Sequence, residues 1–122
     1  MLTLAQQMLR IPAMPVELRE LLMSVLKVIA QREPDLDPLF LEVLEPQSVR
    51  CSFDLCVHRY NLRLRDLEPW LTALVRWFLG ERFSLVDCVG SQGMGACMTH
   101  ISSGCTRRGL PYACVYYVLE EI

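Results

Sequence analysis

The sequence has little of what most enzymes and nucleic-acid-binding proteins need. Only two histidines occur in 122 residues, and charged residues make up 21% of the chain, with a formal net charge of −2. A general nucleic-acid-binding protein needs a basic surface that displaces counterions, so nucleic-acid binding is not expected. The chain has no G-x-S-x-G nucleophile motif and no pair of acidic residues spaced for general acid–base catalysis. We therefore expect a protein that is not an enzyme.

Long apolar runs are also absent. No stretch approaches the ~18 consecutive apolar residues of a membrane-spanning helix, so no membrane contact is expected. Residues 1–15 show no basic start, no long apolar run and no small-residue cleavage site of the kind that marks a secretory signal. The sequence thus predicts an intracellular protein in a reducing compartment, in which its six cysteines are free thiols.

Apolar residues, in contrast, are plentiful. They make up 52% of the chain, enough for the core of one domain over residues 1–122, with residues 1–14 forming a short N-terminal helix or arm. A chain this small has a large surface for its volume, so part of this apolar content is expected at contacts between subunits.

The clearest element is a helix predicted over residues 66–80. Apolar residues recur with the three- and four-residue spacing of one buried stripe. Asp66 is a candidate N-cap, Pro69 suits the first turn, and Gly80 suits the end of the helix. The stripe consists of Leu67, Trp70, Leu71, Leu74, Val75 and Phe78.

A second helix is predicted over residues 15–32, with a stripe from Leu18 to Ile29. Period-two alternation then indicates strands, with Cys51, Phe53 and Leu55 on a core face and Asp54 and Cys56 on the other. Turns are expected at residues 45–48 and 102–109. The predicted strands cover residues 39–45, 49–60, 82–89, 97–102 and 112–120.

The predicted order of elements is α-α-β-β-α-β-(β)-β. Strand pairs joined by short turns favour a mainly antiparallel sheet, with the helices packed on one of its faces. The sequence therefore predicts the α+β class.

Cysteines and histidines form the candidate metal ligands. Asp54, Cys56 and His58 share one face of a predicted strand, and Cys97-x-x-His100 resembles half of a zinc site. No C-x-x-C or H-x-x-x-H partner completes that motif. Cys56, His58, Cys97 and His100 together could bind zinc, while the alternative is an ordinary strand surface with buried thiols that need no cofactor.

Two further segments have simple interpretations. Residues 90–95, GSQGMG, lack the lysine and hydroxyl residue of a phosphate-binding loop and are expected to form a turn or mobile loop. Arg107 and Arg108 are expected in a solvated turn, with contact to an acidic partner as the alternative.

The last predicted strand is rich in aromatic and β-branched residues. Tyr112, Tyr116, Tyr117 and Val118 are the candidate interface residues, because such a strand either lies in the core or is an edge that pairs with another subunit.

The order of elements resembles the early-region-four, open-reading-frame-three proteins of adenoviruses over residues 15–122. The matching segments are ELRELLMSVL (17–26), FLEVLEP (40–46), SFDLCVH (52–58), SSG (102–104) and YYVLEEI (116–122). The resemblance implies a viral early protein that dimerises, assembles further and captures host proteins, in the nucleus or cytoplasm of a host cell. The chain departs from this family in its six cysteines, its two tryptophans and residues 90–95, so no individual binding residue is carried over.

Residues 86–97, VDCVGSQGMGAC, resemble the cysteine-containing end of four-vinyl-reductase-type sensory domains. That resemblance implies binding of a small hydrophobic molecule or a metal, with Cys88 and Cys97 as the relevant thiols.

Two functions follow from these observations. The first is a non-enzymatic interaction protein that binds itself, as a homodimer or larger assembly, and other proteins. The alternative is a sensory domain that binds a small ligand or a metal through its cysteines.

Overall fold

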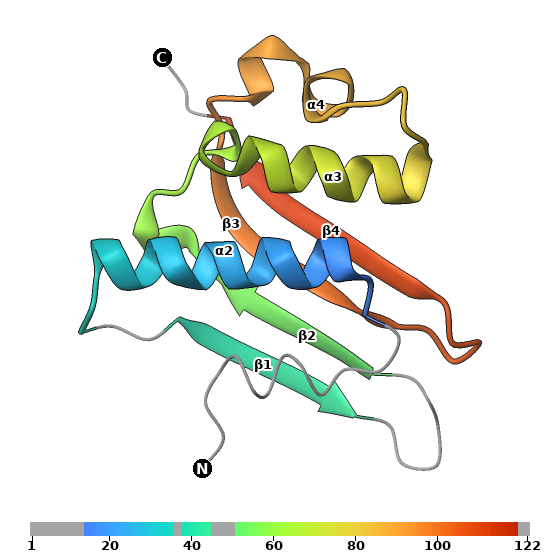
Figure 1. The fold of residues 1–122 in the computed structure, drawn as a ribbon. Coiled ribbons are helices and arrows are strands. Elements are labelled where there is room, and N and C mark those ends of the chain that lie inside the picture. The colour runs from blue at the N-terminus through green and yellow to red at the C-terminus, as the bar shows by residue number, and fades with distance from the viewer. Residues whose placement is uncertain (1–13, 36–37, 45–50, 120–122) are drawn as a thin grey trace.

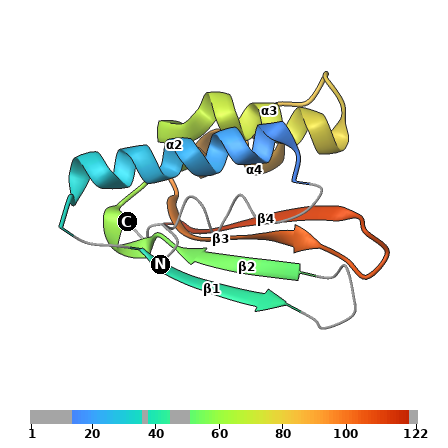
Figure 2. The same cartoon turned by 60° about the horizontal axis from the view of Figure 1, so that its bottom comes forward.

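The computed structural model describes residues 14–35, 38–44 and 51–119. In these ranges α2 (Val16–Arg32), α3 (Glu68–Leu79) and α4 (Leu85–Gly93) form one layer, and four strands form the other (Figure 1). All three helices lie on the same face of the sheet (Figure 2). The predicted α+β class, with helices on one face of an antiparallel sheet, is confirmed.

The sheet has the simple order β1-β2-β3-β4, and each strand runs antiparallel to its neighbours. This up-and-down order places β1 and β4 at the two edges. The strands are β1 (Leu39–Leu44), β2 (Cys51–Cys56), β3 (Cys97–Cys105) and β4 (Pro111–Val118).

Helix α2 agrees with its prediction. Pro15 precedes its first residue, and the apolar stripe is buried against the sheet. Burying one such side chain contributes about 1.5–3 kcal/mol, so the stripe is enough to hold the helix in place. Its buried residues are Leu18, Leu21, Leu22, Val25 and Ile29.

Helix α3 begins two residues later than predicted. Asp66 does not cap it. The Asp66 carboxylate instead accepts a hydrogen bond from the Arg63 backbone N–H (2.9 Å) and closes a short 3₁₀ turn, η2 (Leu64–Leu67). Pro69 lies in the first turn of α3, and Gly80, with φ of 115°, follows its last residue, as predicted.

The predicted strand over residues 49–60 is shorter in the structure. β2 ends at Cys56, and η1 (His58–Tyr60) is a 3₁₀ turn. Burial alternates along β2 as predicted, but His58 leaves the face that carries Asp54 and Cys56. The prediction that these three residues share one face is wrong for His58.

The strand predicted over residues 82–89 is wrong, because this segment enters helix α4. Ser84 and Asp87 form a capping box: the Asp87 carboxylate accepts from the Ser84 N–H (2.8 Å) and hydroxyl (3.0 Å). A side chain that satisfies unpaired N–H groups at this spacing favours a helix start. Residues 90–93 of the expected loop therefore belong to α4, which is kinked at Gly90 (φ 76°).

β3 is longer than the predicted strand over residues 97–102. It runs through Cys105, so only the second half of the turn predicted over residues 102–109 lies in the β3–β4 connection. The predicted helix in residues 1–14 and the turn at residues 45–48 lie outside the described residues, apart from Met14.

The buried hydroxyl of Thr72 connects α3 to the start of α4. Its Oγ1 accepts a hydrogen bond from the Leu85 N–H (3.1 Å) and donates to Glu68 (3.1 Å). We expect Thr72→Val to lower the free energy of unfolding by about 1–3 kcal/mol, because a buried N–H loses its partner while the side-chain shape is kept. Urea unfolding measures this. Thr72→Ser, which keeps the hydroxyl, is the control, and equal stability of the two variants would show that the bond does not hold α4.

Candidate interaction surface

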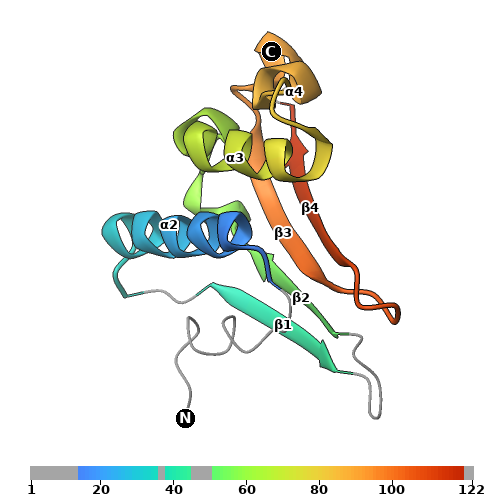
Figure 3. The ribbon, with the colours of Figure 1, turned by 45° about the vertical axis from the view of Figure 1, so that its right-hand side comes forward.

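β4 is an edge strand whose outer side is not covered by any described segment (Figure 3). The Ser103 hydroxyl donates to the Tyr112 carbonyl (2.6 Å), and the Thr99 hydroxyl donates to the Tyr116 carbonyl (3.2 Å), so both carbonyls point toward β3. Because peptide groups alternate along a strand, those of Ala113 and Val115 point to the open side. They are available to pair with another strand.

The sequence of this edge carries neither a charge nor an internal proline as protection against pairing, although the ladder to β3 has a bulge between Met98 and His100. Residues 110–119, LPYACVYYVL, contain no charged side chain, and their one proline stands at the start of β4. Natural edge strands commonly carry lysine, internal proline or a bulge that blocks another chain. Over residues 14–35, 38–44 and 51–119, the outer edge of β4 is therefore not hydrogen-bonded to another strand, and its own side chains carry no charge.

The four predicted interface residues lie on this strand but on different faces. Tyr116 and Val118 are exposed (53% and 46%), Tyr117 is 39% exposed, and Tyr112 is half-buried. Tyr112 and Tyr116 are in register with Gly104 and His100, which places them on the face away from the helices. Tyr117 is in register with the buried Met98 and lies on the helix side.

An apolar groove of about 410 Å³ runs between α3, α4 and β4 on the helix side. None of the described residues that line it is charged. Its rim includes the Phe78 side chain at 39% exposure and Leu79 at 57%, and the Phe78 ring meets the Trp77 ring edge-on at 4.7 Å between centroids. The lining residues are Leu64, Leu71, Leu74, Val75, Phe78, Leu79, Leu85, Cys88, Val89, Ala113, Val115 and Tyr117.

The sequence did not reveal this groove. Val75 and Phe78 were predicted to belong to the buried stripe of α3, but Val75 is half-buried, Phe78 is exposed, and both line the groove. The only signal was the run Trp77-Phe78-Leu79, in which three large apolar residues follow one another. A single buried stripe cannot use all three, because consecutive residues point in different directions around a helix.

A small polar cluster lies on the other face of the sheet. Nδ1 of His100 is 3.1 Å from the Asp54 carboxylate, and the His100 ring meets the Tyr116 ring edge-on at 6.3 Å. Cys56 is the register partner of His100. A carboxylate that orients a histidine is one part of a catalytic site, but this cluster is open to solvent, with about 40% of each side chain of the pair exposed.

The predicted zinc ligands are not gathered at one place. Cys56 and His100 are cross-strand neighbours, whereas His58 is exposed in η1 and Cys97 is buried, with its thiol 3.7 Å from the Met98 carbonyl. Within the described ranges, no group of three or more histidine, cysteine or acidic side chains is placed to hold a metal ion.

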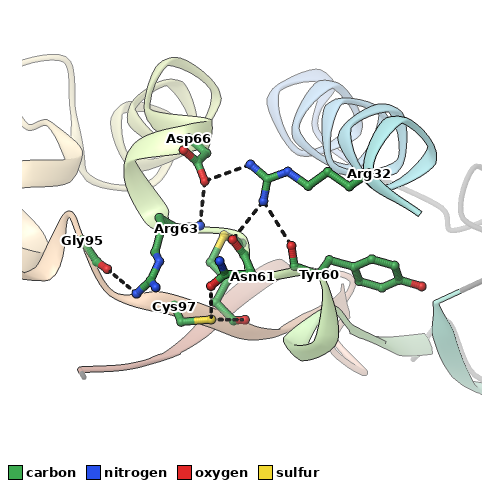
Figure 4. Close-up of polar contacts among 8 residues, drawn as sticks. Arg32, Tyr60, Asn61, Arg63, Asp66, Gly95 and Cys97 are labelled. Atoms are coloured by element: carbon green, nitrogen blue, oxygen red, sulfur yellow. Dashed lines mark hydrogen bonds and ion pairs between the residues drawn. The ribbon is translucent and has the colours of Figure 1, made fainter. Parts of the chain in front are cut away.

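Arginines hold the connection between β2 and α3 (Figure 4). The Arg32 guanidinium, at the end of α2, donates to the carbonyls of Tyr60 (3.1 Å) and Asn61 (2.9 Å) and lies 3.4 Å from the Asp66 carboxylate. Arg63 donates to the Gly95 carbonyl (3.0 Å). These contacts join three segments of the fold. Arg107 and Arg108 are exposed in the β3–β4 turn, as predicted.

Comparisons with protein-family models, curated proteins and solved structures found no match to this chain. None of the described helices has both the length and the apolar composition that crossing a membrane would require.

We expect the exposed apolar residues of α3 to contribute little to the stability of the isolated chain. Leu79→Gln should change the free energy of unfolding by no more than about 0.5 kcal/mol, because this side chain is already 57% exposed. Leu74→Gln, five residues earlier and 5% exposed, should lower it by about 2–5 kcal/mol. Denaturant unfolding at low protein concentration compares the two, and a large loss from Leu79→Gln would show that Leu79 belongs to the core.

Proposed function

We propose that this chain is a self-associating interaction protein that binds a second copy of itself through β4 and the adjacent apolar groove. The observation that carries the proposal is that, in the described part of the chain, an uncharged edge strand with no further strand paired to it lies beside a groove with no charged lining. Both features leave apolar surface in water, and both would be buried by one partner.

A second copy suits this surface because two identical β4 edges can pair with each other without bringing like charges together. Two β4 strands that pair antiparallel about a two-fold axis place the same residues opposite one another, and with no charges in residues 110–119 no like charges meet. The peptide groups of Ala113 and Val115 would bond across the axis, and the two sheets would become one. The apolar rims formed by Phe78 and Leu79 would then lie on the same side of the joined sheet.

Binding of other proteins is a natural extension of this proposal. An open strand edge beside a groove is the arrangement that takes up an extended peptide, with backbone pairing for affinity and a groove for side chains. The adenoviral resemblance adds a specific prediction, in which such assemblies capture host proteins inside the cell. Capture and compartment both remain predictions.

The groove also favours a second candidate, the small-ligand sensor. A cavity of about 410 Å³ with apolar walls fits an uncharged aliphatic or aromatic molecule, and Cys88 lines it as the second resemblance implies. Cys97 does not line the groove, so the pair of thiols expected there is not assembled. Such a ligand would raise the stability of a monomer, whereas self-association makes stability depend on protein concentration.

Charged substitutions at Cys114 test the self-pairing directly. Cys114 lies in the middle of β4 and is exposed. We expect Cys114→Lys and Cys114→Glu each to weaken self-association at least tenfold, because like charges would meet across the axis, and an equal mixture of the two variants to associate again. Light scattering after gel filtration, in reducing buffer over a range of concentrations, measures the mass.

The matched control places the same charges at Ser52, on the same face of the sheet but on the interior strand β2. The Ser52 variants should associate like the unmodified chain. A monomeric unmodified chain at all concentrations, or Cys114 variants that each associate normally, would contradict the proposal.

A further inference from the structure

Cys51 and Cys105 lie directly opposite each other on the adjacent strands β2 and β3. They are direct register partners, Cys51 as the first residue of β2 and Cys105 as the last residue of β3. Both side chains are on the helix side of the sheet and buried, at 4% and 2% exposure. Directly opposite residues of antiparallel strands have Cα atoms about 4.5–5.5 Å apart, which is within the range that a disulfide spans.

The neighbouring residue brings the two strands close together at this point. A Cβ on Gly104 would overlap the Cys51 carbonyl oxygen and would lie 2.7 Å from the Ser52 Cα. Only glycine allows this approach, so β2 and β3 are in tight contact beside the two thiols.

The two thiols also influence each other. Burial raises the pKa of the Cys51 thiol above its ordinary value, and the nearby Cys105 raises it further, while a backbone hydrogen bond with Cys105 acts in the opposite direction. Charge on one sulfur is therefore felt at the other, as expected for groups in close proximity.

We propose that Cys51 and Cys105 form an intramolecular disulfide when the protein meets hydrogen peroxide. One thiol loses its proton and attacks the peroxide as the thiolate, taking up an oxygen to become a sulfenic acid, and the proton leaves with the released hydroxide as one water. Because burial disfavours the thiolate, this first step is the slow one. The sulfur of the second thiol then displaces that oxygen, which leaves as a second water, and the S–S bond forms. Two hydrogens and two electrons leave the protein, and one peroxide is reduced to two waters.

The bond would connect the start of β2 to the end of β3 and enclose α3 and α4 in a covalent loop. A cross-link between distant parts of a chain stabilises the fold mainly by restricting the unfolded chain. It would leave the proposed β4 surface unchanged, since both thiols are buried on β2 and β3. The modification is therefore separate from self-association.

The test uses the full chain with Cys56, Cys88, Cys97 and Cys114 replaced by serine, so that only the two opposed thiols remain. After treatment with hydrogen peroxide, we expect a single chain, not covalently linked to another, that has lost two hydrogens by intact mass and has no thiol left to alkylate. We also expect a rise in melting temperature of roughly 5–15 °C, reversed by a dithiol reductant.

Two controls test whether the disulfide forms between these two cysteines. Adding Cys105→Ser to the same variant should remove both the mass loss and the rise in melting temperature. Because the serine variant could fold poorly, peptide mapping of the oxidised unmodified chain gives a second readout, in which Cys51 and Cys105 should appear in one cross-linked peptide. Oxygen added to single cysteines without a Cys51–Cys105 link, in either protein, would overturn the proposal.

Discussion

The burial of one face of the sheet beneath α2 and α3 is the contact on which the rest of the structure depends. Phe53, Leu55 and Ile101 from the interior strands meet the stripe of α2 and the buried leucines of α3, and these residues belong to one continuous core. The sheet cannot bury its apolar face without the helices, and the helices have no other partner for their stripes. The Arg32 contacts fix the end of α2 to the connection that leads into α3.

The same contact explains why one part of the surface remains apolar. In the last turn of α3, Phe78 and Leu79 are 39% and 57% exposed, and they line the groove together with residues of α4 and β4. α4 is held beside α3 by the Thr72 hydroxyl and leaves the groove open between the two helices and β4. The groove and the edge of β4 are thus adjacent, because Ala113, Val115 and Tyr117 of this edge strand also line the groove.

The sequence was sufficient for the fold class and for α2, because apolar periodicity depends only on neighbouring residues. It failed at α4, where Ser84 and Asp87 favour a helix over the strand that Leu85, Val86 and Val89 suggested. It also failed wherever strand register decides contacts. The pairs His100–Asp54 and Cys51–Cys105 join β2 to β3 over some 50 positions of sequence, and a shift of one residue would separate them. The groove depends on how α3, α4 and β4 are placed relative to one another, which periodicity does not show.

The position of β1 has a consequence for larger assemblies. β1 forms the second edge of the sheet, opposite β4. A dimer joined through β4 would carry a β1 strand at each of its two outer ends, so that, within the described residues, both ends of its eight-stranded sheet would be edge strands. Pairing of β1 with β1 would then add whole dimers end to end, and two different two-fold contacts on one subunit produce a linear filament and not a closed ring.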